Sequence, residues 1–191
     1  VHELPDPCVP VGVGLRLLRE ERGGHVAQAA GIEQTRPVEV TGAALSPLTD
    51  GTDASVGQAI PAVQGASFDG TPVSIGGDGQ ATIIAFVAHW CPHCQREVPL
   101  LTGHLASNPL PDGIELVTVS TSTNPEQPNY PPSAWLEEEG WPGPVLADST
   151  DGAVAEAFGL TGFPYFVAVD SAGTVVAQYQ TLNSSAQWLE P

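Results

Sequence analysis

The chain has no lysine and no methionine, and arginine, present five times, is its only strongly basic residue. Against these arginines stand 22 acidic residues, which give a formal net charge of −17. After residue 40 the only arginine is Arg96, so a cationic face able to displace counterions from a nucleic acid cannot be assembled there. Anionic lipid surfaces are disfavoured for the same reason. The acidic residues indicate a solvated surface, with a docking face for a cationic partner as the alternative.

Long apolar runs and a recognisable signal peptide are also missing. No stretch approaches the roughly 18 apolar residues of a membrane-spanning helix. Because the chain begins at Val1 and lacks methionine, we expect a processed or truncated product whose leader or anchor was removed. Three cysteines, two of them in one Cys-x-x-Cys motif, give no disulfide framework, so we expect catalytic rather than structural thiols.

The sequence divides into three parts of different character. Residues 1–40 hold four of the five arginines and are expected to form an N-terminal extension of unknown role. Residues 41–56 are polar and rich in turn-forming residues, which is typical of a linker. Residues 57–191 are expected to form one domain, because short apolar runs there alternate with segments of helical spacing.

Within the domain, the pattern predicts a regular order of elements. We expect hairpins at 62–75 and 165–179, strands at 81–88, 114–120 and 144–147, and helices at 92–107, 133–139 and 150–158. Strands that alternate with helices and end in a hairpin predict an α/β fold, with a central mixed sheet covered by helices on both faces.

The most informative stretch is Trp90-Cys91-Pro92-His93-Cys94, directly after the apolar run 83–88. The run predicts a buried strand, and the segment after Cys94 has helical spacing. A Cys-x-x-Cys motif at this junction places its first sulfur at a helix N-terminus, where unpaired N–H groups and the helix dipole favour a thiolate. We therefore expect Cys91 to be an exposed nucleophile, and Cys94 to be the sheltered cysteine that resolves a mixed disulfide.

This motif, with Gly162-Phe163-Pro164 ahead of a later strand, resembles the active site of the thioredoxin superfamily. The resemblance covers about residues 57–180, and it implies a thioredoxin-like fold. Pro164 is then expected to form a cis peptide bond that faces the cysteines, and Phe163 to offer its backbone to the substrate.

Glu97 and the spacing after it resemble the extracytoplasmic TlpA/ResA/CcmG-like branch of that superfamily. The extra helix at 133–139 corresponds to a TlpA-type insertion between the Cys-x-x-Cys helix and the strand after Pro164. Glu97 lies three residues past Cys94, on the same helix face, and is expected to accept its proton during resolution. Ala85 stands where ordinary thioredoxins carry a buried aspartate, so proton transfer is left to Glu97 or to water.

The residues around the two cysteines are expected to modulate the site. The Pro-His dipeptide formed by Pro92 and His93 resembles that of DsbA-type oxidants. His93, as an imidazolium, is expected to stabilise the Cys91 thiolate and make the disulfide more oxidising. Trp90 is expected to pack beside the site and frame Cys91. His89 and a more distant histidine, His104, are expected to be surface or packing residues.

Together these features predict a protein disulfide oxidoreductase that needs neither a metal nor an organic cofactor. Its substrates are expected to be protein thiols and disulfides in an extracytoplasmic compartment, and we expect a monomer whose redox partner is a membrane protein. The direction of electron flow stays open. The Pro-His dipeptide favours an oxidant or isomerase, whereas Glu97 and the insertion favour a reductase such as those of cytochrome c biogenesis.

Two other functions are alternatives. The first is a thiol peroxidase, although Ala88 stands where peroxiredoxins need a threonine. The second is a copper-binding or metallochaperone module that uses Cys91 and Cys94 with His89 or His93. Cys8 lies outside the resemblance, where a free thiol and an intermolecular disulfide are equally compatible with the sequence.

Overall fold

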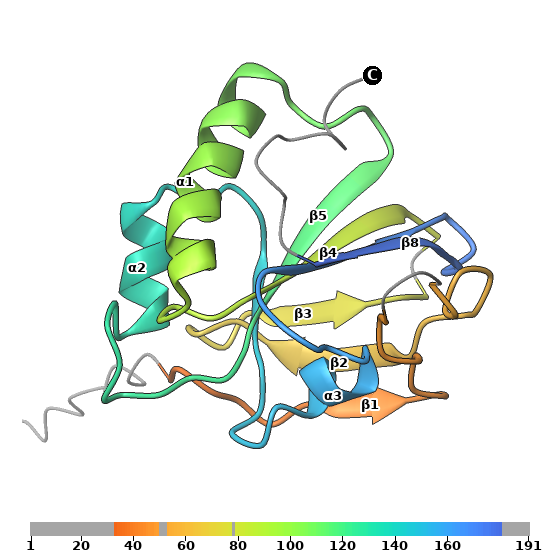
Figure 1. Cartoon of the computed structure of the whole chain (residues 1–191), viewed down its shortest axis with the longest axis horizontal. Helices are drawn as coiled ribbons and strands as arrows, with labels where there is room; N and C mark the ends of the chain where they lie inside the picture. The colour runs from red at the N-terminus through yellow and green to blue at the C-terminus, as the bar shows by residue number, and fades with distance from the viewer. Residues whose placement is uncertain (1–32, 50–52, 78, 181–191) are drawn as a thin grey trace, which may run out of the picture.

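The computed structural model describes residues 33–49, 53–77 and 79–180, and its main element is a five-stranded mixed sheet. The central strand β4 (Ala81–Val87) runs parallel to β5 (Ile114–Ser120), which in turn runs parallel to the edge strand β6 (Val145–Ala147). On its other side β4 pairs antiparallel with β7 (Tyr165–Val169), which forms a hairpin with β8 (Val175–Gln180) (Figure 1). The sheet therefore has the predicted mixed topology.

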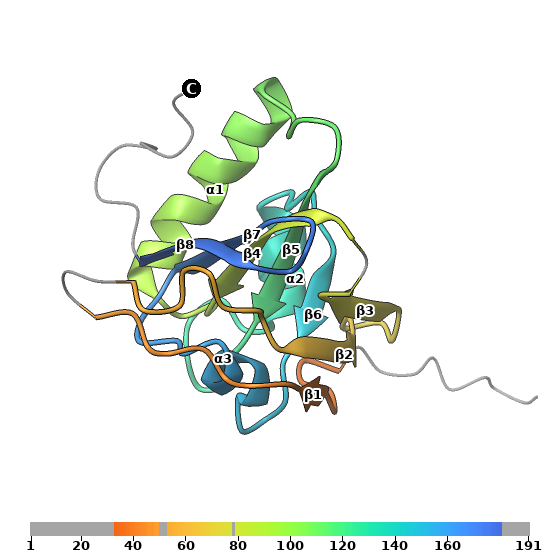
Figure 2. The same cartoon turned by 90° about the vertical axis from the view of Figure 1, so that its right-hand side faces the viewer.

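Helices cover both faces of this sheet. Figure 2 shows α1 (Pro92–Ser107) on one side of the strands and the short α3 (Ala153–Ala157) on the opposite side. The remaining helix, α2 (Pro132–Glu138), lies in the insertion between β5 and β6, beside α1. No helix in the described part of the chain is long and apolar enough to cross a membrane.

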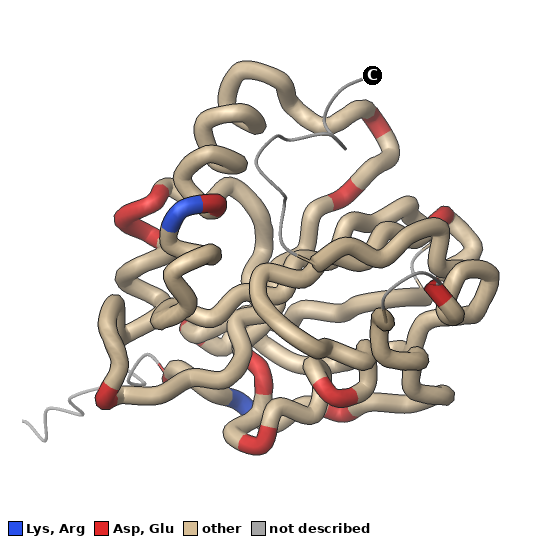
Figure 3. The backbone as a smooth tube through the Cα atoms, viewed as in Figure 1, with Lys and Arg blue, Asp and Glu red and all other residues tan. Residues whose placement is uncertain are grey.

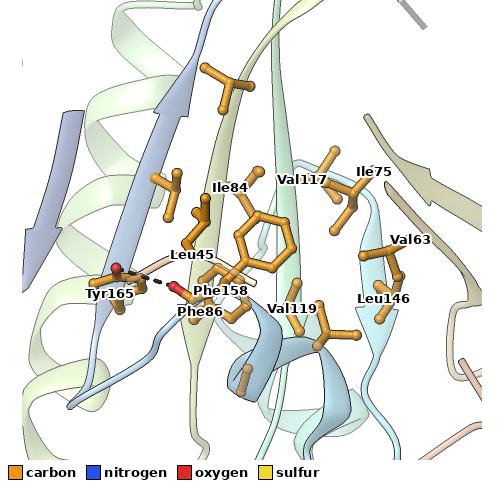
Figure 4. Close-up of a cluster of buried hydrophobic side chains, with 14 of the residues drawn as sticks. Leu45, Val63, Ile75, Ile84, Phe86, Val117, Val119, Leu146, Phe158 and Tyr165 are labelled. Carbon is orange, nitrogen blue, oxygen red and sulfur yellow. Dashed lines mark hydrogen bonds between the residues drawn. The ribbon is translucent and has the colours of Figure 1, made fainter. Parts of the chain in front are cut away.

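Alternating residues of β4 supply the cores on the two faces, as the period of a strand requires. Ala85 points to the α1 side, where it packs in a cluster with Leu101 of α1 and Phe166 of β7. Its neighbours Ile84 and Phe86 belong to the larger cluster on the other face. There, two aromatic rings pack against Phe86, with centroid distances of 5.3 Å to Phe158 and 5.8 Å to Tyr165 (Figure 4).

A second, three-stranded sheet extends the larger core. The predicted hairpin is present as β2 (Ala62–Ala66) and β3 (Pro72–Ile75), with Val63 opposite Ile75. Both side chains are buried in the same cluster as Leu146 of β6. The third strand, β1 (Glu39–Thr41), pairs antiparallel with β2 and was not predicted from the sequence.

The described part of the predicted linker packs on the domain rather than standing apart from it. Leu45 is only 4% exposed and lies in the main core, and its N–H donates to the carbonyl of Ala157. Ser55 is fully buried, and its hydroxyl donates to the carbonyl of Ser46. These contacts are made by single residues and backbone hydrogen bonds. They leave no periodic apolar pattern in the sequence from which the packing of this polar segment could be predicted. The division of the chain at residues 40 and 56 stays a prediction, and Cys8 lies outside the described residues.

The helix predicted at 150–158 is shorter in the structure, because its start is fixed by a buried carboxylate. Asp148 accepts hydrogen bonds from the N–H groups of Val154 and Ala155, at 3.0 and 3.2 Å. Gly152 precedes the helix with φ +74°, a left-handed conformation that glycine adopts without strain. Residues 149–152 consequently form a turn, and α3 begins only at Ala153.

Candidate active site

The Cys-x-x-Cys motif lies where β4 meets α1, as predicted. Cys91 caps the N-terminus of α1 with extended backbone angles, φ −72° and ψ 121°. Its carbonyl accepts the N–H of Gln95, the first hydrogen bond of the helix. Pro92 occupies the first helical position, where its missing N–H costs nothing. The first sulfur is therefore carried by the residue at the positive end of a 16-residue helix.

Both cysteines are thiols in the structure, and both are buried. Cys94 is fully buried, as expected, but Cys91 is only 6% exposed, so the expectation of an exposed sulfur was wrong. The reason lies outside the motif, in the loop before β7. The Cys91 Sγ donates to the carbonyl of Phe163 at 3.7 Å, which brings that loop against the sulfur.

Burial has a direct consequence for the second thiol. It raises the pKa of Cys94 far above its ordinary value, because the thiolate is the charged form and would be held away from water. The nearby Cys91 and the charge of Glu97 raise the pKa further, while a hydrogen bond with the Ala88 backbone opposes them. A thiolate at Cys94 would therefore require a proton acceptor nearby.

Glu97 is buried at 5% exposure on α1, near enough to Cys94 for its charge to act on the thiol. The described part of the chain buries one other carboxylate, Asp148, which is used to cap α3. Ala85 is fully buried in an apolar cluster, so the preceding strand supplies no carboxylate at that position. Glu97 is thus buried within electrostatic range of Cys94, and its role as proton acceptor stays a prediction.

The loop before β7 supplies the other side of the site. The Phe163–Pro164 peptide bond is cis, as predicted, and Pro164 is buried. The Phe163 ring meets the Trp90 ring edge to face, with centroids 5.8 Å apart. Trp90 is fixed in turn by its indole N–H, which donates to the carbonyl of Ser122 at 2.8 Å. Trp90, Cys91 and Phe163 therefore converge from segments far apart in the sequence.

His93 and Pro92 lie on the exposed side of the motif. The Nδ1 atom of His93 is 2.8 Å from Nη2 of Arg96, a residue that the sequence did not single out for this site. Arg96 also forms an ion pair with Glu97, with Nη2 3.5 Å from Oε1. An arginine two residues after the second cysteine leaves no motif, so only the structure identifies this contact.

His89 is fully buried and ties the insertion to the active-site turn. Its Nδ1 donates to the carbonyl of Pro128 at 2.7 Å, and its Nε2 accepts the N–H of Asn124 at 3.2 Å. The ring also meets Tyr130 edge to face, and burial lowers the pKa of His89 below its ordinary value. Both ring nitrogens are therefore used for structure, which agrees with the expected packing role.

The same contacts argue against His89 as a copper ligand, because neither of its nitrogens is available to a metal. Among residues 33–49, 53–77 and 79–180, no group of three or more His, Cys, Asp or Glu side chains is arranged to hold a metal ion.

The fold and the site define the class of protein: a thioredoxin-like domain with a Cys-x-x-Cys pair at the start of its first helix. Residues 55–186 match the model of the Redoxin family, and the chain belongs to that family. The structure is similar to the thioredoxin domain of a thiol-disulfide oxidoreductase from Bacteroides vulgatus, with a TM-score of 0.55 and 25% identity. That likeness covers 66% of this chain and 89% of the other.

Two curated proteins are similar in sequence. Sporulation thiol-disulfide oxidoreductase A of Bacillus subtilis is 31% identical over 83 residues, which are 44% of this chain and 49% of that protein. Thiol:disulfide interchange protein HelX of Rhodobacter capsulatus is 30% identical over 101 residues, 53% of this chain and 52% of that protein. The chain thus spans about half the length of the curated relatives it matches.

A secreted disulfide oxidoreductase of Mycobacterium tuberculosis has the same fold, with a TM-score of 0.52 at 20% identity. This likeness covers 64% of this chain and 85% of the other.

Proposed function

We propose that this chain catalyses thiol–disulfide exchange on protein substrates through Cys91 and Cys94. The observation that carries the proposal is the contact between the Cys91 Sγ and the carbonyl that precedes the cis-proline, at the start of α1. A helix N-terminus favours a thiolate, and the facing loop offers backbone to a substrate chain. The names of both curated relatives, which describe oxidoreduction and interchange of disulfides, support the same chemistry.

When the protein reduces a substrate disulfide, the exchange proceeds in two steps. The Cys91 thiolate attacks one sulfur of a substrate disulfide, so a mixed disulfide forms and the other substrate sulfur leaves as a thiolate. Cys94 then loses its proton and attacks the Cys91 sulfur, which releases the second substrate thiolate. The substrate gains two electrons, and the protein is left with a Cys91–Cys94 disulfide. The same steps in reverse oxidise a dithiol.

The other site residues serve binding and proton transfer in this proposal. The Phe163 backbone pairs with the substrate main chain beside the sulfur under attack, in the manner of an added β-strand. The rings of Trp90 and Phe163 frame the approach to Cys91. Glu97 accepts the Cys94 proton in the second step, since burial raises the pKa of that thiol.

We further propose that the protein acts outside the cytoplasm, as a monomer that exchanges electrons with a membrane-bound redox partner. The secreted Mycobacterium tuberculosis protein of the same fold supports the compartment. The partner sets the direction of electron flow in the cell, and the reduction potential of the Cys91–Cys94 couple measured in isolation assigns the chain to reductases or oxidants.

Trapping of the mixed disulfide tests the proposed function. Cys94→Ala keeps the attacking thiol but cannot resolve the intermediate, so incubation with glutathione disulfide should leave glutathione on Cys91. Cys91→Ala should not form that adduct at Cys94, which is fully buried. Peptide mass spectrometry locates the adduct and separates it from any on Cys8. Equal labelling of both variants, or labelling of Cys8 alone, contradicts the assignment of nucleophile and resolving cysteine.

A further inference from the structure

Arg96 joins two residues of the site that the exchange mechanism treats separately. Its side chain is 57% exposed on α1, and its Nη2 lies 2.8 Å from His93 Nδ1 and 3.5 Å from Glu97 Oε1. One guanidinium therefore spans the histidine between the two cysteines and the buried carboxylate near Cys94. Neither the motif nor the proposed function explains why a cation is held there.

The hydrogen bond to His93 fixes where that ring carries its proton. A guanidinium has only donors, so Nδ1 must be the acceptor and carries no hydrogen. The His93 ring is then neutral, with its proton on Nε2. An imidazolium has no acceptor nitrogen, so His93 cannot become the expected cation without releasing Arg96. The positive charge at this position belongs to the guanidinium of Arg96.

Apart from Arg96, the described residues include one arginine, Arg36, which lies before β1 rather than on α1. The other arginine described, Arg36, pairs with Glu33 at 3.0 Å and donates to the carbonyl of Phe68 at 2.7 Å. Arg96 lies on α1 and Arg36 in the segment before β1, and Figure 3 shows the two basic positions apart from one another. A cation held near the start of the helix adds to the helix dipole in favouring a thiolate at Cys91.

We propose that Arg96 is a positioning residue that sets the redox equilibrium of the Cys91–Cys94 couple, with neutral His93 orienting its guanidinium. This inference rests on the proposed thiol–disulfide exchange and deepens it. Arg96 stabilises the reduced form through the thiolate, which makes the disulfide more oxidising. His93 contributes as an acceptor rather than as a charge, which reverses the role that its place between the cysteines suggested.

The first test reads the ring of His93 directly. Nitrogen-15 chemical shifts of the histidine side chains distinguish protonated from unprotonated ring nitrogens. In the full chain we expect His93 with an unprotonated Nδ1, and we expect Arg96→Gln to remove that preference. His104, near the other end of α1, serves as the control whose signals stay unchanged. A His93 ring that is identical in both proteins, or one with a proton on Nδ1, overturns the inference.

The second test measures the equilibrium constant with glutathione in a double-mutant cycle. Arg96→Gln should make the disulfide less oxidising by about fivefold when His93 is present, a change within the range of exposed charge interactions. In a His93→Ala background the same substitution should change the constant by about twofold or less, because the guanidinium is no longer oriented. Equal effects in both backgrounds overturn the inference.

Two controls separate this inference from the proposed function. Leu100→Gln changes another exposed residue of α1, 68% exposed, and should leave the equilibrium unchanged. If the unaltered protein forms no Cys91–Cys94 disulfide with glutathione, the proposed function fails. If it does form one and Arg96→Gln leaves the constant unchanged, only the role of Arg96 fails.

Discussion

At the scale of single residues, the proposed role of the buried Glu97 as proton acceptor predicts how quickly the second cysteine can act. The thiolate of Cys94 is disfavoured by burial, so a proton acceptor beside it should speed resolution. Glu97→Gln should slow the release of substrate from the mixed disulfide by about a hundredfold, the lower end of what a general base contributes. The first attack by Cys91 should change much less. Stopped-flow kinetics of the two steps measures both rates.

Faster resolution in Glu97→Gln, the opposite outcome, would also have a physical reason. The charge of Glu97 raises the pKa of Cys94, so its removal alone would make the thiolate easier to form. If that electrostatic effect dominated, Glu97→Gln would speed resolution, and the role as proton acceptor would be refuted. Glu138→Gln, which changes an exposed acid of α2, provides the matched control for net charge.

His89 gives a second prediction, concerning stability against pH. Burial lowers its pKa in the folded protein below the ordinary 6.5, so the unfolded chain binds the proton more readily. The free energy of unfolding is therefore highest above the ordinary pKa, and it falls as the pH drops below that value towards the lowered pKa of the folded state. Urea unfolding between neutral and mildly acidic pH should show this decrease. His89→Gln should remove that part of it, and an equally steep decrease in the variant would refute the assignment.

At the scale of elements, most of the sheet could be predicted from the sequence because its strands are rich in apolar and β-branched residues. The runs at 81–88 and 114–120 are mostly buried, and they appear as β4 and β5 with nearly the predicted bounds. β1 could not be predicted, since it is only three residues long and lies in a polar segment. In the structure its middle residue is partly buried and the other two are exposed, as in an edge strand. The start of α3 was missed because it depends on Asp148, whose partners become neighbours only in the fold.

The same contrast holds for the candidate site. Cys91 and Cys94 could be singled out from the spacing of their motif, and Glu97 and Pro164 from the resemblance to the thioredoxin superfamily. Arg96 could not be singled out, because its contact with His93 joins two helix residues that form no known motif. The anchoring role of His89 could not be predicted either, because its partners are loop backbone groups more than 30 residues away. The near-complete burial of Cys91 was missed for the same reason, since the covering loop lies 72 residues further along the chain.

The capping of α3 by Asp148 leads to a prediction at this scale. Its carboxylate accepts three backbone N–H groups, from Ser149, Val154 and Ala155, and it is fully buried. Asp148→Ala should lower the free energy of unfolding by about 2 kcal/mol, the upper part of the range for a lost N-cap. Urea unfolding measures the change. Asp151→Ala, which alters an exposed acid of the same turn, should cost far less, and equal losses in the two variants would contradict the capping role.

At the scale of the whole molecule, the excess of acidic residues determines the electrostatic field around the protein. The net charge is −17, and after residue 40 a single arginine stands against 16 acidic residues. Figure 3 shows acidic positions distributed over the helices, the strands and the connecting loops rather than gathered at one place. The field around the protein is therefore negative, and long-range attraction should favour cationic substrates over anionic ones.

This field predicts which substrates react fastest. Two disulfide-bonded peptides of the same length, one flanked by arginines and the other by glutamates, differ only in charge. At low salt the cationic peptide should react with the reduced protein at least about tenfold faster, the lower part of the range for electrostatic steering. The difference should shrink as the ionic strength approaches about 1 M, where the screening length falls to roughly 3 Å. Stopped-flow rates measured across a salt series test this, with glutathione disulfide and a neutral peptide as references. A preference for the cationic peptide that persists unchanged at high salt would mean that short-range contacts, and not the overall charge, select the substrate.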